Sequence, residues 1–355
     1  MSDHARTATT AATGRPGSRL RSIAHRLIGD ADVLPVEGPV PPFTGATGWL
    51  NGEPLTPEGL RGRVVLVDFW TYTCINWIRT FPYVRAWADK YHDHGLTVIG
   101  AHTPEFGFER NIDNVTARSH DFGIEYPVAV DSDYGVWNAF ANHYWPAVYV
   151  TDAKGRIRYH HFGEGEYAMT EMVVQQLLTD AGADGFDPDL VTVAPKGFEI
   201  PADWQTLRTP ETYLGLGRTT GFASPDEPRI NRLHGYPEPH RLELDQWAPT
   251  GTWRLATHAA VNGSGGDRIA LRFQARDVHL VMGPETRDAS IPFRVFLDGD
   301  VPGGAHGGDV DESGDGTLAD QRLYQLIRQP GPVEERLFEI EFADAGAEAY
   351  CFTFG

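Results

Sequence analysis

The chain has 355 residues, of which 41% are hydrophobic and 22% are charged, a composition typical of an ordinary globular protein with about two domains. The formal net charge of −19 argues against a nucleic-acid-binding surface and against docking on anionic lipid. Only two cysteines are present, Cys74 and Cys351, so the fold is not built on a disulfide framework.

Residues 1–34 are rich in Ala, Thr, Ser, Gly and Arg, and charged side chains interrupt them every few positions. This pattern predicts a disordered tail and lacks the apolar core of a signal peptide. No run approaches the ~18 apolar residues of a membrane span. We therefore expect a soluble protein that is cytoplasmic as written, with an extracytoplasmic location still open.

The next part of the chain alternates between strand and helix patterns. Residues 64–69 (VVLVDF), apolar except for Asp68, lie between Gly62 and Thr71 and predict a buried strand. The following elements are then expected in order: a helix at 74–94 kinked at Pro82, a strand at 96–101, a helix at 106–122, a strand at 127–130, a short helix at 134–140, two strands at 147–151 and 157–162 joined by a hairpin turn, and a helix at 166–180. This order predicts an α/β domain over residues 35–183.

The composition and the pattern of apolar residues change after residue 183. Residues 184–210 are rich in Gly, Pro and Asp and are interpreted as a linker. Short alternating runs follow at 241–244, 252–260, 268–274, 278–282, 293–297, 322–328, 337–342 and 349–354. Strands of this number and spacing predict an all-β sandwich or jelly-roll domain over residues 211–355.

The segment Val67–Trp77, with the sequence VDFWTYTCINW, resembles the strand, loop and helix start of the thioredoxin family, where V-D-F-W leads into C-x-x-C. Pro82 matches the family's helix-kinking proline. The segment Tyr144–Val150 (YWPAVYV) resembles its cis-proline and the strand that follows. Any one of these motifs alone is weak, but their order along the chain is specific.

The helix and strand inserted between residues 106 and 130 make the TlpA and redoxin type the most similar branch of that family. Residues 71–87 and 164–167 further resemble the soluble C-terminal half of DipZ-type proteins, and this resemblance covers residues 35–355. It implies a thioredoxin fold followed by a sandwich like a carbohydrate-binding module. It also implies that Cys74 is the attacking thiol and that the Trp145–Pro146 bond is cis.

The physical chemistry of the motif supports a reactive Cys74. A cysteine at a helix N-terminus faces free backbone N–H groups and the positive end of the helix dipole, so we expect it to be partly exposed with a lowered pKa. Asp68, at the end of the buried strand, is the candidate proton acceptor. Trp70 and Trp77 are expected to wall the site. A cis peptide before Pro146 would present a backbone edge to a substrate chain beside the sulfur.

The sequence departs from C-x-x-C at Trp77, which cannot release a mixed disulfide as a second cysteine does. Cys351 lies in an alternating strand pattern and is expected to be a core residue. Three outcomes stay open: an external thiol releases the mixed disulfide, Cys74 reduces a peroxide through a sulfenate, or the chain is a non-catalytic binding protein. Thr71 favours the peroxidase, because it stands three residues before the cysteine as in peroxiredoxins. Val67 disfavours the peroxidase, because the peroxiredoxin motif has a proline at that position.

The leading hypothesis is a monothiol thiol–disulfide oxidoreductase that needs no cofactor. Its partners would be a protein or small-molecule disulfide and an external thiol reductant. Thr71, Trp145, His102, Glu105 and His143 are further candidates for the substrate groove, because their loops and strand ends are expected at the same sheet edge as Cys74.

Other polar patterns carry weaker signals. His160 and His161 alternate across a strand, so both cannot face one metal, and no zinc spacing occurs. Residues 309–320 scan like a calcium loop, with candidate ligands Asp309, Asp311, Ser313, Asp315 and Asp320, although a solvated hairpin is the favoured interpretation. Trp204, Trp247 and Trp253 are candidates for a sugar-stacking platform, and glycan binding by the sandwich stays open as a hypothesis.

Overall fold

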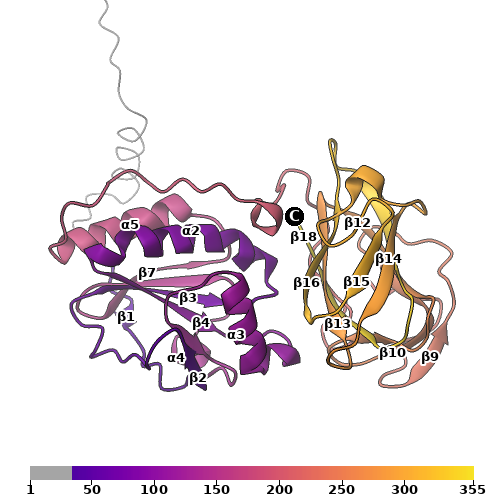
Figure 1. Ribbon diagram of the computed structural model, residues 1–355, viewed down its shortest axis with the longest axis horizontal. Coiled ribbons are helices and arrows are strands. Elements are labelled where there is room, and N and C mark those ends of the chain that lie inside the picture. The colour runs from indigo at the N-terminus through magenta and orange to yellow at the C-terminus, as the bar shows by residue number, and fades with distance from the viewer. Residues whose placement is uncertain (1–33) are drawn as a thin grey trace, which may run out of the picture.

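The computed structural model describes residues 34–355, which form an α/β unit (residues 34–180) and a β-rich unit, the sandwich (residues 212–354), lying side by side (Figure 1). An extended connecting segment (residues 181–211) runs between them. The expected disordered tail lies outside the described residues except for Leu34. None of the helices between residues 34 and 355 has the length and apolarity that a membrane crossing requires.

The α/β unit is built on one seven-stranded sheet. Its spatial order is β1 (Gly38–Pro39), β7 (Arg156–Phe162), β6 (Ala147–Thr151), β3 (Val64–Trp70), β4 (Leu96–His102), β5 (Val128–Val130) and β2 (Gly48–Leu50). Strands β3, β4 and β5 are parallel, and β6 pairs antiparallel with β3 and β7. This is a thioredoxin fold with an inserted helix and strand.

Helices cover both faces of the sheet. They are α2 (Ile75–Tyr91), α3 (Ile112–Asp121), α4 (Gly135–Ala139) and α5 (Tyr167–Asp180), with short 3₁₀ turns η1 (His92–His94) and η2 (Gly107–Arg110). Val64 and Leu66 of β3 pack with residues of α2 and α5, whereas Val65, Val67 and Phe69 pack with residues of α4. Because both faces are covered, β3 is apolar throughout except for Asp68.

The helix expected at 106–122 is interrupted. It divides into η2 and α3 at Asn111, which has extended backbone angles. The Asn111 side chain accepts the Asp113 N–H at 2.9 Å and so caps the new helix start. An asparagine favours this break because its short amide satisfies a free helical N–H group.

The sandwich is an antiparallel sheet of eleven strands that curls over on itself. The order is β15 (Asp315–Leu318), β14 (Ile291–Leu297), β17 (Glu335–Phe342), β12 (Asp267–Gln274), β10 (Trp247–Leu255), β11 (Ala260–Asn262), β18 (Ala347–Phe354), β13 (Asp277–Pro284) and β16 (Arg322–Arg328), with β8 (Thr212–Tyr213) on β18 and β9 (Leu233–Tyr236) on β10. Strand β10 turns the corner, because residues before Gly251 pair with β12 and later ones with β9 and β11. Gly251 has φ +96°, and a Cβ there would meet the Asp267 carboxylate, so the bend requires glycine.

Two of the expected strands are wrong in detail. Residues 241–244 form a turn region, in which the Gln246 N–H donates to the Glu243 carbonyl at 3.0 Å and Asp245 has φ 67°. Residues 252–260 divide into β10 and β11, because Ala256 and Ala259 close a tight turn with a 2.8 Å backbone hydrogen bond. The alternation of side chains continues through such turns and so conceals them in the sequence.

Candidate functional site

Cys74 lies in the short loop between β3 and α2, at the N-cap of the helix. Its N–H donates to the Thr71 carbonyl at 3.2 Å, and its own carbonyl accepts the Ile78 N–H at 3.0 Å. The predicted position at the start of a helix is therefore confirmed. A buried strand and a long helix hold the loop rigidly on both sides.

The expected exposure and lowered pKa of Cys74 are wrong in this structure. The side chain is only 9% exposed. Burial raises the pKa of the thiol well above its ordinary value, the nearby carboxylates of Glu211 and Glu105 raise it further, and the N–H groups of Trp77 and Asn76 oppose these effects. The helix terminus acts as the sequence predicts, but burial in an apolar cluster that also contains sandwich residues outweighs its effect.

Trp77 points into the core instead of walling an open site. Its ring stacks on Trp70 with centroids 4.5 Å apart, and its indole N–H donates to Asp68 Oδ2 at 2.9 Å. Burial raises the pKa of Asp68 to about 7, and the Trp77 hydrogen bond only partly offsets this. Among residues 34–355, Asp68 hydrogen-bonds to Trp77 and has no hydrogen bond to Cys74.

A second buried carboxylate, Glu109, was not found from the sequence. Its Oε1 accepts the Thr73 hydroxyl at 2.7 Å, and its Oε2 accepts the N–H groups of Glu105 and Phe106 at 2.7 and 2.8 Å. Burial raises the pKa of Glu109 to about 7, although the hydrogen bond from Thr73 opposes the rise. Glu109 thereby joins the Cys74 loop to the segment after β4. Its place in an expected helix concealed it, because a glutamate there is typical of a solvated face.

The Trp145–Pro146 peptide bond is cis, as expected, and Pro146 is buried at the start of β6. Trp145 packs on Trp137 with centroids 4.3 Å apart and also borders the apolar cluster that contains Cys74. His143 is exposed, and its ring contacts Tyr144.

The remaining groove candidates differ in their surroundings. His102 is fully buried, edge-on to Trp70 and stacked on Tyr72, and burial lowers its pKa to about 3. It is therefore a neutral core residue. Thr71 is also fully buried. Glu105 is the candidate that reaches the sandwich, where it accepts hydrogen bonds from Tyr213 and Arg218.

The candidate calcium loop does not gather its carboxylates. Asp309 pairs with Arg322 at 2.7 Å, Asp315 with Arg294 at 2.5 Å and Asp320 with Arg118 at 3.5 Å, while Asp311 accepts the Ser313 N–H at 2.8 Å. No group of three or more His, Cys, Asp or Glu side chains suited to a metal occurs in the described part of the chain. Arginines thus neutralise three of the acids that the loop pattern would give to an ion.

The stacking platform is wrong for two of its three tryptophans. Trp247 and Trp253 are fully buried in the sandwich core, whereas Trp204 is 60% exposed on the connecting segment. The expectation that Cys351 is a core strand residue is confirmed, because it lies in β18 and is 2% exposed.

Comparison with known proteins finds relatives of the α/β unit and of the sandwich. The thiol–disulfide oxidoreductase YkuV of Bacillus subtilis is 37% identical over 145 residues, which are 40% of this chain and 95% of YkuV. The chain belongs to the thioredoxin-like redoxins. The model of the AhpC/TSA family matches residues 36–160, and that of the thioredoxin-like C-terminal domain matches residues 209–355.

Some of the relatives are much longer than this chain. Protein DipZ of Mycobacterium tuberculosis is 39% identical over 253 residues, which are 69% of this chain and 35% of DipZ. The chain thus spans about a third of the length of the DipZ proteins that it matches. A solved thioredoxin-like protein in its oxidised form is 34% identical and aligns over 40% of this chain and 96% of its own, with a TM-score of 0.38.

Proposed function

We propose that the protein is a thiol–disulfide oxidoreductase that acts through the single thiol of Cys74. The observation that carries the proposal is the cysteine at the N-terminus of α2, behind a buried strand, in a chain that covers nearly all of the oxidoreductase YkuV. Backbone N–H groups at this helix end stabilise a thiolate once solvent reaches the sulfur. Asp68, with a pKa of about 7, is a buried acid suited to exchanging protons at neutral pH.

The proposed reaction proceeds in two exchanges. The Cys74 thiolate attacks one sulfur of a disulfide R–S–S–R′, which forms Cys74–S–S–R and releases R′–S⁻. A thiolate R″–S⁻ from outside the chain then attacks the R sulfur, which forms R–S–S–R″ and restores the Cys74 thiolate. The number of disulfides is unchanged over the two exchanges. The external thiol attacks the mixed disulfide and so performs the release step that the second cysteine performs in a C-x-x-C motif.

The test is to incubate the full chain with hydroxyethyl disulfide and to locate the adduct by peptide mass spectrometry. We expect one mercaptoethanol adduct on Cys74 that persists until a thiol is added, because no second cysteine stands in the motif. Cys351→Ser is the control and should form the same adduct. If wild type and Cys74→Ser behave alike, Cys74 is not the nucleophile and a binding-only protein is supported instead.

A thiol peroxidase is the second candidate, which the AhpC/TSA match over residues 36–160 favours. In that case Cys74 would attack a peroxide and become a sulfenate, releasing water or an alcohol. Peroxide followed by dimedone separates the two functions. Rapid dimedone labelling of Cys74 supports the peroxidase, whereas a chain that forms the disulfide adduct but takes up no dimedone supports the exchange reaction.

The substrate is proposed to be a protein or small-molecule disulfide. The domain limits at residues 35, 183 and 211 and the cytoplasmic location stay predictions. Glycan binding by the sandwich also stays a prediction, now resting on Trp204 alone among the three candidate tryptophans.

A further inference from the structure

The face of the sandwich that meets the α/β unit lies over the Cys74 loop. Cys74 shares one buried apolar cluster with six sandwich residues: Ala259, Val261, Val281, Leu323, Tyr350 and Cys351. These residues come from β11, β13, β16, β18 and the turn before β11. Sandwich residues therefore belong to the cluster that buries the sulfur, which a disulfide substrate would have to reach.

A β-bulge shapes this face. The register between β13 and β18 shifts so that Val281 pairs with Cys351 and Met282 with Ala349, which leaves Tyr350 as the extra residue. The shift turns Tyr350 out of the sandwich core, and its ring lies 5.3 Å from Phe106 and 5.0 Å from Phe108 in the α/β unit. Bulges commonly redirect one side chain in this way.

Polar contacts join the units on both sides of Cys74. Glu105 Oε1 accepts the Tyr213 hydroxyl at 2.6 Å and Arg218 Nη1 at 2.8 Å, and the Arg218 guanidinium also lies 3.6 Å from the Tyr213 ring centroid. We name these three residues the latch. On the other side, Arg79 of α2 donates to the Phe354 carbonyl at 2.9 Å.

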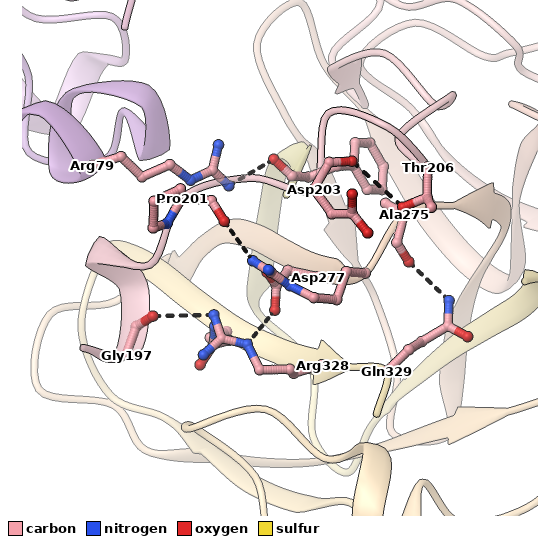
Figure 2. A network of polar contacts seen from close by, with 12 residues as sticks. Arg79, Gly197, Pro201, Asp203, Thr206, Ala275, Asp277, Arg328 and Gln329 are labelled. Carbon is pink, nitrogen blue, oxygen red and sulfur yellow. Dashed lines mark hydrogen bonds and ion pairs between the residues drawn. The ribbon is translucent and has the colours of Figure 1, made fainter. Parts of the chain in front are cut away.

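The connecting segment is fixed at both ends and free in the middle. On the side of the α/β unit, the Val191 N–H donates to Glu171 of α5 at 2.9 Å. Further on, Arg328 and Arg276 of the sandwich donate to the carbonyls of Gly197 at 3.0 Å and Pro201 at 2.8 Å (Figure 2). Residues 192–195 make no hydrogen bond with any other described residue. These four residues are therefore the candidate hinge, and opening about them must also break the 3.4 Å Arg85–Glu199 ion pair between α2 and the segment beyond.

The interface is only partly filled. A crevice of about 390 Å³ separates α3 from the sandwich, lined by Asn114 and Arg118 on one side and by Arg287 and Asp320 on the other. Arg118–Asp320 and Arg287–Asn114 contacts of 3.5 and 3.3 Å cross it. This part of the interface is polar and loosely filled, as in units that move relative to one another, whereas the part around Cys74 is apolar.

We propose that the sandwich is a cap that closes over Cys74, is held by the latch, and must swing about residues 192–195 to admit the disulfide substrate. The proposal rests on the proposed function, since it concerns the regulation of the same thiol. In the closed state the sulfur is buried and its pKa is raised, so both access and thiolate formation depend on opening.

The test measures how fast N-ethylmaleimide labels Cys74 in the native full chain, with peptide mass spectrometry to separate Cys74 from Cys351. Wild-type Cys74 should react at least about tenfold slower than in the urea-unfolded chain, because labelling waits for opening. Arg218→Glu removes the cation that pairs with Glu105 and adds a carboxylate beside those of Glu105 and Glu211, so it should speed labelling about five- to thirtyfold. Arg218 is 55% exposed, so the sandwich core is untouched.

Arg241→Glu is the matched control, since it reverses the same charge on an exposed sandwich residue that pairs with Glu243. It should label at the wild-type rate. Tyr213→Phe removes one latch hydrogen bond and should speed labelling less than Arg218→Glu. Small-angle scattering should show a larger radius of gyration for Arg218→Glu, at an unchanged melting temperature of the sandwich.

Two results would overturn the cap: wild-type Cys74 that labels as fast as the unfolded thiol, or Arg218→Glu that labels no faster than Arg241→Glu. Labelling reports access to the sulfur and not turnover. Latch-dependent labelling in a chain that forms no disulfide adduct would therefore support the cap and overturn only the proposed function.

Discussion

Asp68→Asn tests how strongly burial controls the acid beneath the site. The wild-type carboxyl lies wholly inside the α/β unit, where its one hydrogen-bond donor among the described residues is the indole of Trp77. An asparagine keeps an oxygen for that indole and removes the ionisation. Any difference that depends on pH between the two proteins then reports the cost of the buried charge.

The direction follows from proton linkage. Burial raises the pKa of Asp68 from 3.8 to about 7, so the folded state binds this proton more tightly than the unfolded chain. The resulting stability is complete below pH 4 and is lost as the pH rises through 7. The full effect is about 4 kcal/mol, at roughly 1.4 kcal/mol for each tenfold change in proton affinity. Between pH 5 and pH 8 the wild type should lose about 2–3 kcal/mol relative to Asp68→Asn.

Urea unfolding of the full chain at pH 5, 6, 7 and 8 measures this difference. Asp93→Asn, which removes one exposed carboxylate from the same unit, is the matched control and should follow the wild type. Other buried acids such as Glu109 cancel in the comparison because both proteins contain them. A wild-type and Asp68→Asn pair whose difference stays constant within about 0.5 kcal/mol from pH 5 to pH 8 would refute the argument.

Three further substitutions have clear expected outcomes. Trp77→Cys should let the Cys74 adduct leave without added thiol, which the lifetime of the adduct measures. Because the substitution empties a fully buried indole site beside Asp68, it should also lower the free energy of unfolding by about 3–5 kcal/mol, which urea unfolding measures. Glu109→Ala strands three donors and should cost about 3 kcal/mol in urea unfolding, whereas Glu109→Gln, which can accept and donate at the same positions, should recover most of it. Gly135→Ala would bring its Cβ within 2.7 Å of the Gly45 Cα and should cost about 1–3 kcal/mol in thermal unfolding, whereas Gly107→Ala, with open space around it, should not.

Local signals made the α/β unit predictable. The apolar run of β3, the helical spacing after Cys74 and the Trp145–Pro146 pair each act within a few residues, and their order along the chain specifies the thioredoxin fold. The same reasoning failed where backbone turns interrupt a continuing alternation, as between β10 and β11. A bend such as that at Gly251 depends on contact with Asp267, which a local pattern does not contain.

The environment of Cys74 was not predictable for a related reason. The helix N-terminus is a local feature and correctly indicated where the thiol lies. The exposure and pKa of the thiol depend on residues far along the chain, including Glu211 and the strand that carries Tyr350. No periodicity or motif in either unit indicates that the two units meet at this loop, so the cap could be recognised only in three dimensions.

Trp77 shows how one residue can have different meanings at the two levels. In the sequence it stands where the thioredoxin motif has its second cysteine, and for that reason we propose a site with a single thiol. In the structure its indole stacks on Trp70 and is the hydrogen-bond partner of Asp68, so it fills the core and lowers the cost of a buried acid. With tryptophan at this position, the core behind the Cys74 loop is packed and hydrogen-bonded. A cysteine at position 77 would supply the thiol that releases the mixed disulfide. Because it would not fill the space of the indole, it would also destabilise the fold that positions Cys74.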